Sequence, residues 1–240
     1  MPAFISEEVS TMFIFGDWTF IILIPALLFS IYASLKVNSV FNEYSKRRTM
    51  SGITGADVAR ELLWRSGISC IPVEMTDKRL GDHYDPQKKV LRLSPEVYRG
   101  NSIASLGVAA HEVGHAIQHK EGYIPLSVRS SLVPVANLGT YAAFPLFFAG
   151  FLFSSAFMVN TGIYLFLAAV LFYLITLPVE FNASRRALAI LEKGRFMTVT
   201  EMDGARKVLD AAAMTYIAAL FMAVSELLRM IILKESFDNS

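Results

Sequence analysis

The chain has 240 residues, of which 54% are hydrophobic, and its mean hydropathy is +0.45. This composition favours a membrane protein over a soluble domain. A formal net charge of +1 is too small for the protein as a whole to attract nucleic acid electrostatically, and no nucleic-acid-binding motif is present. The single cysteine, Cys70, excludes an internal disulfide and a cysteine-based zinc knuckle.

Four long stretches of the chain are apolar enough to cross a bilayer, which requires about 20 residues in a helix. They are residues 18–35, 132–153, 162–179 and 211–233. A buried helix of a soluble protein would explain one such stretch, but four leave too little chain to cover them. The predicted fold class is therefore an α-helical integral membrane protein with about four transmembrane helices.

The basic residues predict how these helices are oriented. Residues 36–129 hold 14 of the 22 lysine and arginine side chains, and residues 180–210 hold six more. The N-terminal arm, residues 1–17, and the loop 154–161 hold none. By the positive-inside rule, we expect a multi-pass protein of a bacterial plasma membrane with both termini outside and residues 36–131 and 180–210 in the cytoplasm.

The one long polar segment, residues 36–131, reads as a small α+β unit. Its apolar residues follow a helical period at first and then alternate, as strand residues do. In chain order we expect a helix over residues 55–65, a strand over 71–75, a turn over 81–86, a strand over 89–94, and a helix from residue 101 or 102 to about 119.

The last of these helices carries the pattern H-E-x-x-H, in His111, Glu112 and His115. Residues four apart project from the same helical face, so both imidazoles can bind one Zn²⁺ ion at about 2.0–2.1 Å. Glu112 then lies beside the open position of the metal, where it can accept a proton from water. A polar helix face turned to water is the alternative interpretation.

His119 lies one turn beyond His115, but three ligands on one straight helix cannot surround a tetrahedral ion. A metzincin would need its third histidine at position 121, which is Glu121. His119 is therefore a candidate for supporting a ligand or contacting substrate. Otherwise it is a cation that suits the C-terminal end of the helix.

A catalytic zinc ion needs a third protein ligand and an open position for water. His83 is the one remaining histidine, and Glu180, directly after the third apolar stretch, is the leading carboxylate. A carboxylate at the hydrocarbon edge is costly unless it is paired or bound to metal. The orientation predicted from the basic residues places Glu180 on the same side of the membrane as the H-E-x-x-H helix. The alternatives are an ion pair of Glu180 with Arg185 or Arg186, or a carboxylate that extends from the hydrocarbon edge to water.

Several blocks of the sequence resemble the YugP-like family of bacterial zinc-dependent membrane proteases. They include Gly81–Pro86, Val90–Ser94, Ala110–His119, Leu132–Asn137 and Leu177–Arg186. The resemblance implies a neutral zinc metallopeptidase, of the gluzincin-like kind, with its site on His111, Glu112 and His115.

A more distant resemblance is to the HtpX and CAAX-processing membrane proteases. Their third zinc ligand lies in a Glu-aromatic-x-Ala-Asp motif, which residues Glu180–Ser184 match up to the last position. This implies the ligand role for Glu180. Ser184 stands where those proteases have Asp, so we expect Asn182 or Asp85 to take over the supporting role of that Asp.

The predicted function is a zinc-dependent membrane endopeptidase with one Zn²⁺ per chain, acting on membrane or membrane-proximal protein substrates. Glu112 is the expected general base, and His83, Tyr84 and Arg186 are candidate donors to the tetrahedral oxyanion. The strand over residues 90–94 is expected to offer an edge to an extended substrate.

Two other classes of protein are considered. A non-catalytic zinc-binding scaffold or chaperone would have four closing ligands and no need of Glu112. A metal transporter would place ligands in the apolar stretches, which contain no histidine. The charged residues of the fourth stretch, Glu226 and Arg229, are three apart and are expected to pair with each other.

Overall fold

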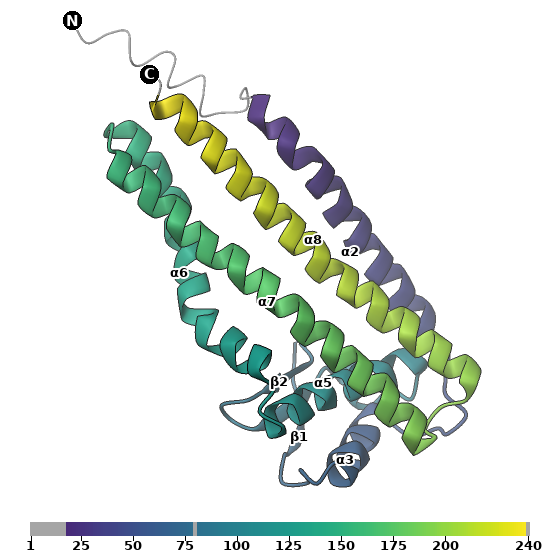
Figure 1. Ribbon diagram of the computed structural model, residues 1–240. Coiled ribbons are helices and arrows are strands. Elements are labelled where there is room, and N and C mark those ends of the chain that lie inside the picture. The colour runs from purple at the N-terminus through teal and green to yellow at the C-terminus, as the bar shows by residue number, and fades with distance from the viewer. Residues whose placement is uncertain (1–17, 79–80, 239–240) are drawn as a thin grey trace, which may run out of the picture. The chain divides into compact units, whose positions relative to one another are not determined.

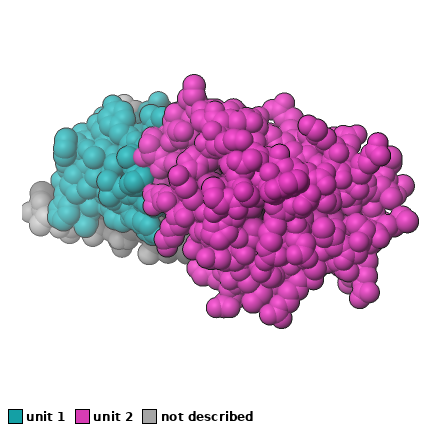
Figure 2. Space-filling model, turned by 90° about the horizontal axis from the view of Figure 1, so that it is seen from below, with its two compact units in different colours: residues 1–31, 134–171, 218–240 teal, residues 32–133, 172–217 magenta. Residues whose placement is uncertain are grey.

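The computed structural model describes residues 18–78 and 81–238 (Figure 1). The predicted N-terminal arm, residues 1–17, lies outside this range. The chain divides into two compact units, which are coloured separately in Figure 2. Unit 1 comprises residues 1–31, 134–171 and 218–240, and unit 2 comprises residues 32–133 and 172–217.

Four helical stretches among the described residues are long and apolar enough to cross a membrane, which agrees with the prediction from sequence. They are η1 with α2 (Trp18–Ile22 and Leu23–Ser45), α6 (Ile124–Leu152), α7 (Ala156–Gly194) and α8 (Val199–Asp238). The helices extend beyond the predicted spans, and unit 2 includes residues 32–45 of α2, 124–133 of α6, 172–194 of α7 and 199–217 of α8. The membrane boundaries themselves stay predictions.

Unit 1 contains most of the apolar spans of these helices. Glycines allow close approach of α6 and α7 there, because Gly139 packs against the backbone of Leu165 and Gly162 against that of Ala143. The pairing expected on α8 is confirmed: Arg229 Nη1 lies 3.0 Å from Glu226 Oε1. The same guanidinium stacks over the ring of Phe20, 4.0 Å from its centroid.

Unit 2 is built around two helices, α3 (Gly55–Arg65) and α5 (Ile103–Lys120), whose bounds agree closely with the prediction. Thr54 caps α3 by accepting a hydrogen bond from the backbone nitrogen of Asp57 (3.2 Å). Ser102 caps α5 in the same way, with Ser105 as the donor (3.1 Å). The apolar faces of the two helices pack against each other and form the core of the unit.

A small sheet packs beside α5. In the described residues it has three strands, β1 (Val73–Met75), β2 (His83–Asp85) and β3 (Val90–Leu93), in the order β1-β3-β2. β1 pairs with β3 in parallel, and β2 pairs with β3 in antiparallel orientation. A short helix, α4 (Pro95–Tyr98), follows β3.

Two expectations for this sheet were wrong. Residues 81–86 were expected to form a turn, but His83–Asp85 form β2, because β3 offers backbone partners from Arg92 to Val90 and Glu112 accepts from the Tyr84 nitrogen. The strand over residues 90–94 was expected to offer an edge to substrate. β3 instead lies between β1 and β2, so its hydrogen-bonding groups are used on both sides.

The contact between α5 and α7 in unit 2 depends on one glycine inside the H-E-x-x-H segment. A Cβ atom at Gly114 would lie 2.6 Å from the backbone oxygen of Ala183, which no real side chain tolerates. Gly107, on the same helix, faces Ala205. A Cβ atom at Gly107 would lie 3.5 Å from that of Ala205, which is an ordinary van der Waals contact.

We expect Gly114→Ala to push α5 away from α7 and to lower the melting temperature of the purified protein, because overpacking costs about 1–3 kcal/mol. Gly107→Ala is the matched control. It should be neutral or stabilising, since alanine improves helix propensity by about 1 kcal/mol. Thermal unfolding in detergent measures both, and equal melting temperatures for the two variants would contradict the packing argument.

Candidate metal centre

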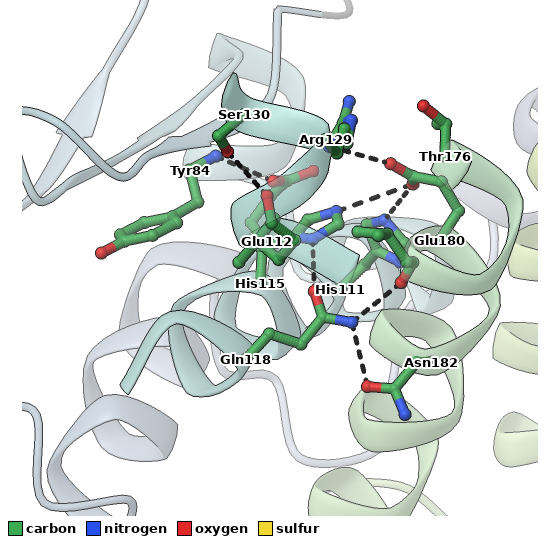
Figure 3. Close-up of polar contacts among 12 residues, drawn as sticks. Tyr84, His111, Glu112, His115, Gln118, Arg129, Ser130, Thr176, Glu180 and Asn182 are labelled. Atoms are coloured by element: carbon green, nitrogen blue, oxygen red, sulfur yellow. Dashed lines mark hydrogen bonds and ion pairs between the residues drawn. The ribbon is translucent and has the colours of Figure 1, made fainter. Parts of the chain in front are cut away.

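Three side chains with metal-binding atoms converge in unit 2 (Figure 3). α5 presents His111 and His115 on one face, and α7 presents Glu180 opposite them. Glu180 Oε2 lies 3.2 Å from His111 Nε2 and 3.6 Å from His115 Nε2. One potential ligand atom from each residue lies within 4.8 Å of the other two. The structure thus brings together the two histidines and the carboxylate singled out in the sequence.

The Nδ1 atom of each imidazole is held by a neighbouring side chain. Ser184 Oγ lies 3.1 Å from Nδ1 of His111. Gln118 Oε1 lies 3.0 Å from Nδ1 of His115. Since the Gln118 amide nitrogen donates to Val179 O (2.8 Å) and Asn182 Oδ1 (2.9 Å), its oxygen must accept the hydrogen on His115 Nδ1. Nε2 is therefore the ring nitrogen of His115 that faces Glu180.

Glu180 is 3% exposed, so its charge needs compensation. Its Oε2 atom faces the imidazoles, and its Oε1 atom lies 3.4 Å from Arg129 Nη1 on α6. The alternative partner Arg186 pairs with Glu121 instead, at 2.7 Å. Two imidazole nitrogens and one buried carboxylate oxygen form the donor set that zinc takes in catalytic sites, so these residues fit the ion.

Glu112 is buried beside this cluster, and β2 holds its carboxylate. The backbone nitrogen of Tyr84 donates to Glu112 Oε2 at 2.9 Å. Figure 3 shows that the Tyr84 ring turns away from Glu112 while its backbone nitrogen faces it. This contact orients the carboxylate, and its donor is a main-chain group that side-chain patterns do not reveal.

The remaining residues predicted for the site lie around it rather than in it. His119 Nδ1 lies 2.8 Å from the hydroxyl of Tyr84, so the two side chains are hydrogen-bonded to each other. Arg186 hydrogen-bonds Asn182 and Glu121. His83 lines the pocket in front of the cluster, with its Nδ1 atom 2.7 Å from Gly81 O.

That pocket has a volume of about 440 Å³ and a mixed polar and apolar lining. We call it the cleft. Besides the cluster and Glu112, its lining includes residues of β2, α6 and α8: His83, Tyr84, Asp85, Arg129, Val133 and Tyr216. The three converging side chains are therefore accessible from this cleft.

The electrostatics of the site follow from burial and from nearby carboxylates. Burial raises the pKa of Asp82, which lines the cleft, although hydrogen bonds from Ser94 oppose the shift. Burial opposes charging of His115, but the contact with Glu180 and the charge of Glu112 raise the pKa of its imidazole overall. Outside the cleft, the ion pair with Arg186 lowers the pKa of Glu121.

The sequence analysis missed four residues of this site: Asp82, Gln118, Arg129 and Tyr216. Gln118 had a signal, since it lies one turn after His115 on the same helix. Arg129 and Tyr216 each place a polar group near the end of a predicted span. Several polar groups lie near span ends. Helix packing decides which of them contacts Glu180, and sequence spacing does not reveal that packing.

Comparisons with known proteins agree with this geometry. The family model described as "Putative neutral zinc metallopeptidase" matches residues 19–235. The chain belongs to this family, which confirms the resemblance found in the sequence blocks.

One relative is the "Putative membrane protease YugP" of Bacillus subtilis (strain 168). It is 48% identical over 210 residues, covering 88% of this chain and 93% of the relative. The relative's name and the four apolar helices support a membrane protein. No solved structure matches the chain.

We expect Ser184→Ala and Gln118→Leu each to weaken zinc binding about 10- to 100-fold, because residues that orient a ligand have effects of that size. Ser130→Ala is a matched control: Ser130 lines the cleft, and its hydroxyl donates to Leu126 O of its own helix. Competition with a zinc chelator of known affinity measures all three. Unchanged affinity in both variants would show that neither residue positions an imidazole.

Proposed function

We propose that this chain is a zinc-dependent membrane endopeptidase. The observation that carries the proposal is the convergence of His111, His115 and Glu180 within 4.8 Å, beside a buried and oriented Glu112. His111, His115 and Glu180 would hold one zinc ion per chain. Membership of a zinc metallopeptidase family supports the same conclusion.

When bound, zinc supplies a Lewis acid that polarises the scissile carbonyl and lowers the pKa of water toward neutrality. Glu112 accepts the proton of the attacking water and delivers it to the departing amine. The hydrogen bond from the Tyr84 backbone holds one carboxylate oxygen, so the other can face the water.

The oxyanion of the tetrahedral intermediate needs a donor that faces the cleft. Tyr216 and Arg129 both line the cleft and both contact Glu180, so we propose them ahead of Tyr84 and Arg186, whose side chains bond elsewhere. His83 lines the cleft and is a further candidate. One such donor contributes about 10²–10³-fold in kcat.

β2 is the strand placed to align a substrate. It is an outer strand of the sheet in the described residues, and all three of its residues line the cleft. The Tyr84 nitrogen bonds Glu112 rather than β3, so this edge faces the reacting groups. An extended peptide lying along β2 would pass beside Glu112, which already accepts from the Tyr84 nitrogen, so that nitrogen is not available to the peptide.

The charge distribution supports a cytoplasmic location for the cleft in a bacterial plasma membrane, with both termini outside. Membrane or membrane-proximal proteins are then the proposed substrates. A non-catalytic scaffold or chaperone is the alternative. The cleft in front of the cluster and the oriented Glu112 favour catalysis, because a structural zinc site is closed by four protein ligands.

Glu112→Gln should keep zinc and lose cleavage of an unfolded model protein by at least about 10²-fold, because the glutamine amide accepts no proton. Glu180→Ala should lose zinc as well. Glu61→Gln is the matched control, since Glu61 pairs with Arg65 on the outer face of α3. Zinc per chain and the cleavage rate are measured together. Parent-level cleavage by Glu112→Gln would remove Glu112 from the mechanism.

Removal of the metal tests the cofactor directly. A strong chelator should abolish cleavage by the parent, and one equivalent of zinc should restore it. Thermal unfolding of the same samples separates loss of activity from loss of fold. Full cleavage by protein shown to be free of zinc would exclude a zinc-dependent reaction.

A further inference from the structure

A second, apolar cavity opens beside the cleft in unit 2. Its volume is about 190 Å³, and most of its exposed lining is carbon. We call it the side pocket. Its walls come from α2, α5 and α8 and include Val37, Phe41, Val108, Leu209, Ala212 and Ala213.

The side pocket and the cleft meet at the reacting groups. His111, Glu112 and Glu180 line both, and so do Asp82 and Tyr216. A peptide bond held over Glu112 therefore lies at the junction of the two. The side chain that enters the side pocket must then belong to a residue directly next to that bond.

The size and lining of the side pocket select one class of side chain. An apolar cavity of about 150 Å³ stays dry and accepts a benzene ring. At about 190 Å³, the side pocket has room for a side chain as large as that of Leu or Phe. Two alanines on α8, Ala212 and Ala213, leave that space open. An anionic side chain would lose its hydration there and would also meet the carboxylates of Asp82, Glu112 and Glu180 at the junction.

We propose that the side pocket is a specificity subsite for a large apolar residue, Leu or Phe, adjacent to the scissile bond. The proposal rests on the proposed peptidase function and adds the substrate class to it. It assigns Ala212 and Phe41 to specificity: Ala212 keeps the pocket open, and Phe41 forms part of its wall.

The test uses two variants that change the pocket in opposite directions. Ala212→Phe fills it, and Phe41→Ala enlarges it. Ala189→Phe is the matched control, because Ala189 is exposed on α7 and the same side chain is added there. Zinc per chain and thermal unfolding confirm that each variant keeps its site and fold.

Cleavage sites in an unfolded model protein are mapped by mass spectrometry, and kcat/KM is measured for peptides that differ only in one residue, Trp, Phe, Leu or Ala. The parent should favour Phe or Leu over Ala by about 10- to 200-fold, the range for apolar pockets. Ala212→Phe should lose most of that preference, and Phe41→Ala should shift it toward Trp. Ala189→Phe should match the parent.

Binding of the same peptides to Glu112→Gln, measured by fluorescence anisotropy, gives a readout that needs no cleavage. Tighter binding of the Phe peptide that disappears when Ala212→Phe is added supports the subsite, even if the parent cleaves nothing. In that case the proposed function alone fails. Cleavage without an apolar preference, or a preference that neither pocket variant alters, overturns the subsite and leaves the peptidase function standing.

Discussion

The burial of one carboxylate between two imidazoles is the interaction on which the rest of the candidate site depends. Glu180 is 3% exposed, and a charge buried to that extent is stable only with partners. Its partners come from two other helices, His111 and His115 on α5 and Arg129 on α6. α5 can approach α7 closely enough only because Gly114 has no side chain. A glycine in the middle of the motif is thus as necessary to the geometry as the histidines.

The hydrogen bonds behind the imidazoles explain a departure from the related sequence pattern. Ser184 stands where the distantly similar proteases have Asp, and the sequence suggested Asn182 or Asp85 as replacements. The structure shows Ser184 itself in contact with His111, at 3.1 Å. Asn182 acts one step further away, by accepting from the Gln118 amide that holds His115. A short hydroxyl suffices at position 184 because α5 and α7 are so close.

Two spaces of different character meet at the proposed reacting groups. The cleft presents strand β2 and polar side chains, which suit the backbone of a peptide. The side pocket presents aliphatic and aromatic carbon, which suits one apolar side chain. This division would let the protein hold many peptides by their backbone while selecting among them by one residue.

The sequence by itself determined the elements that depend on local periodicity and composition. The four apolar helices, the bounds of α3 and α5, and the spacing of His111 and His115 on one helical face all follow from patterns within about 20 residues. Glu180 was singled out because a carboxylate at the end of an apolar stretch needs a partner. Local patterns do not predict which elements contact one another.

Only the tertiary structure decided the contacts made between elements distant in sequence. It made residues 83–85 a strand, because β3 offered them partners, and it turned the Tyr84 nitrogen toward Glu112. It also brought Arg129 and Tyr216 to Glu180 and opened a pocket at Ala212. These features depend on how helices pack, and packing is set by the shapes of surfaces that no single stretch of sequence contains.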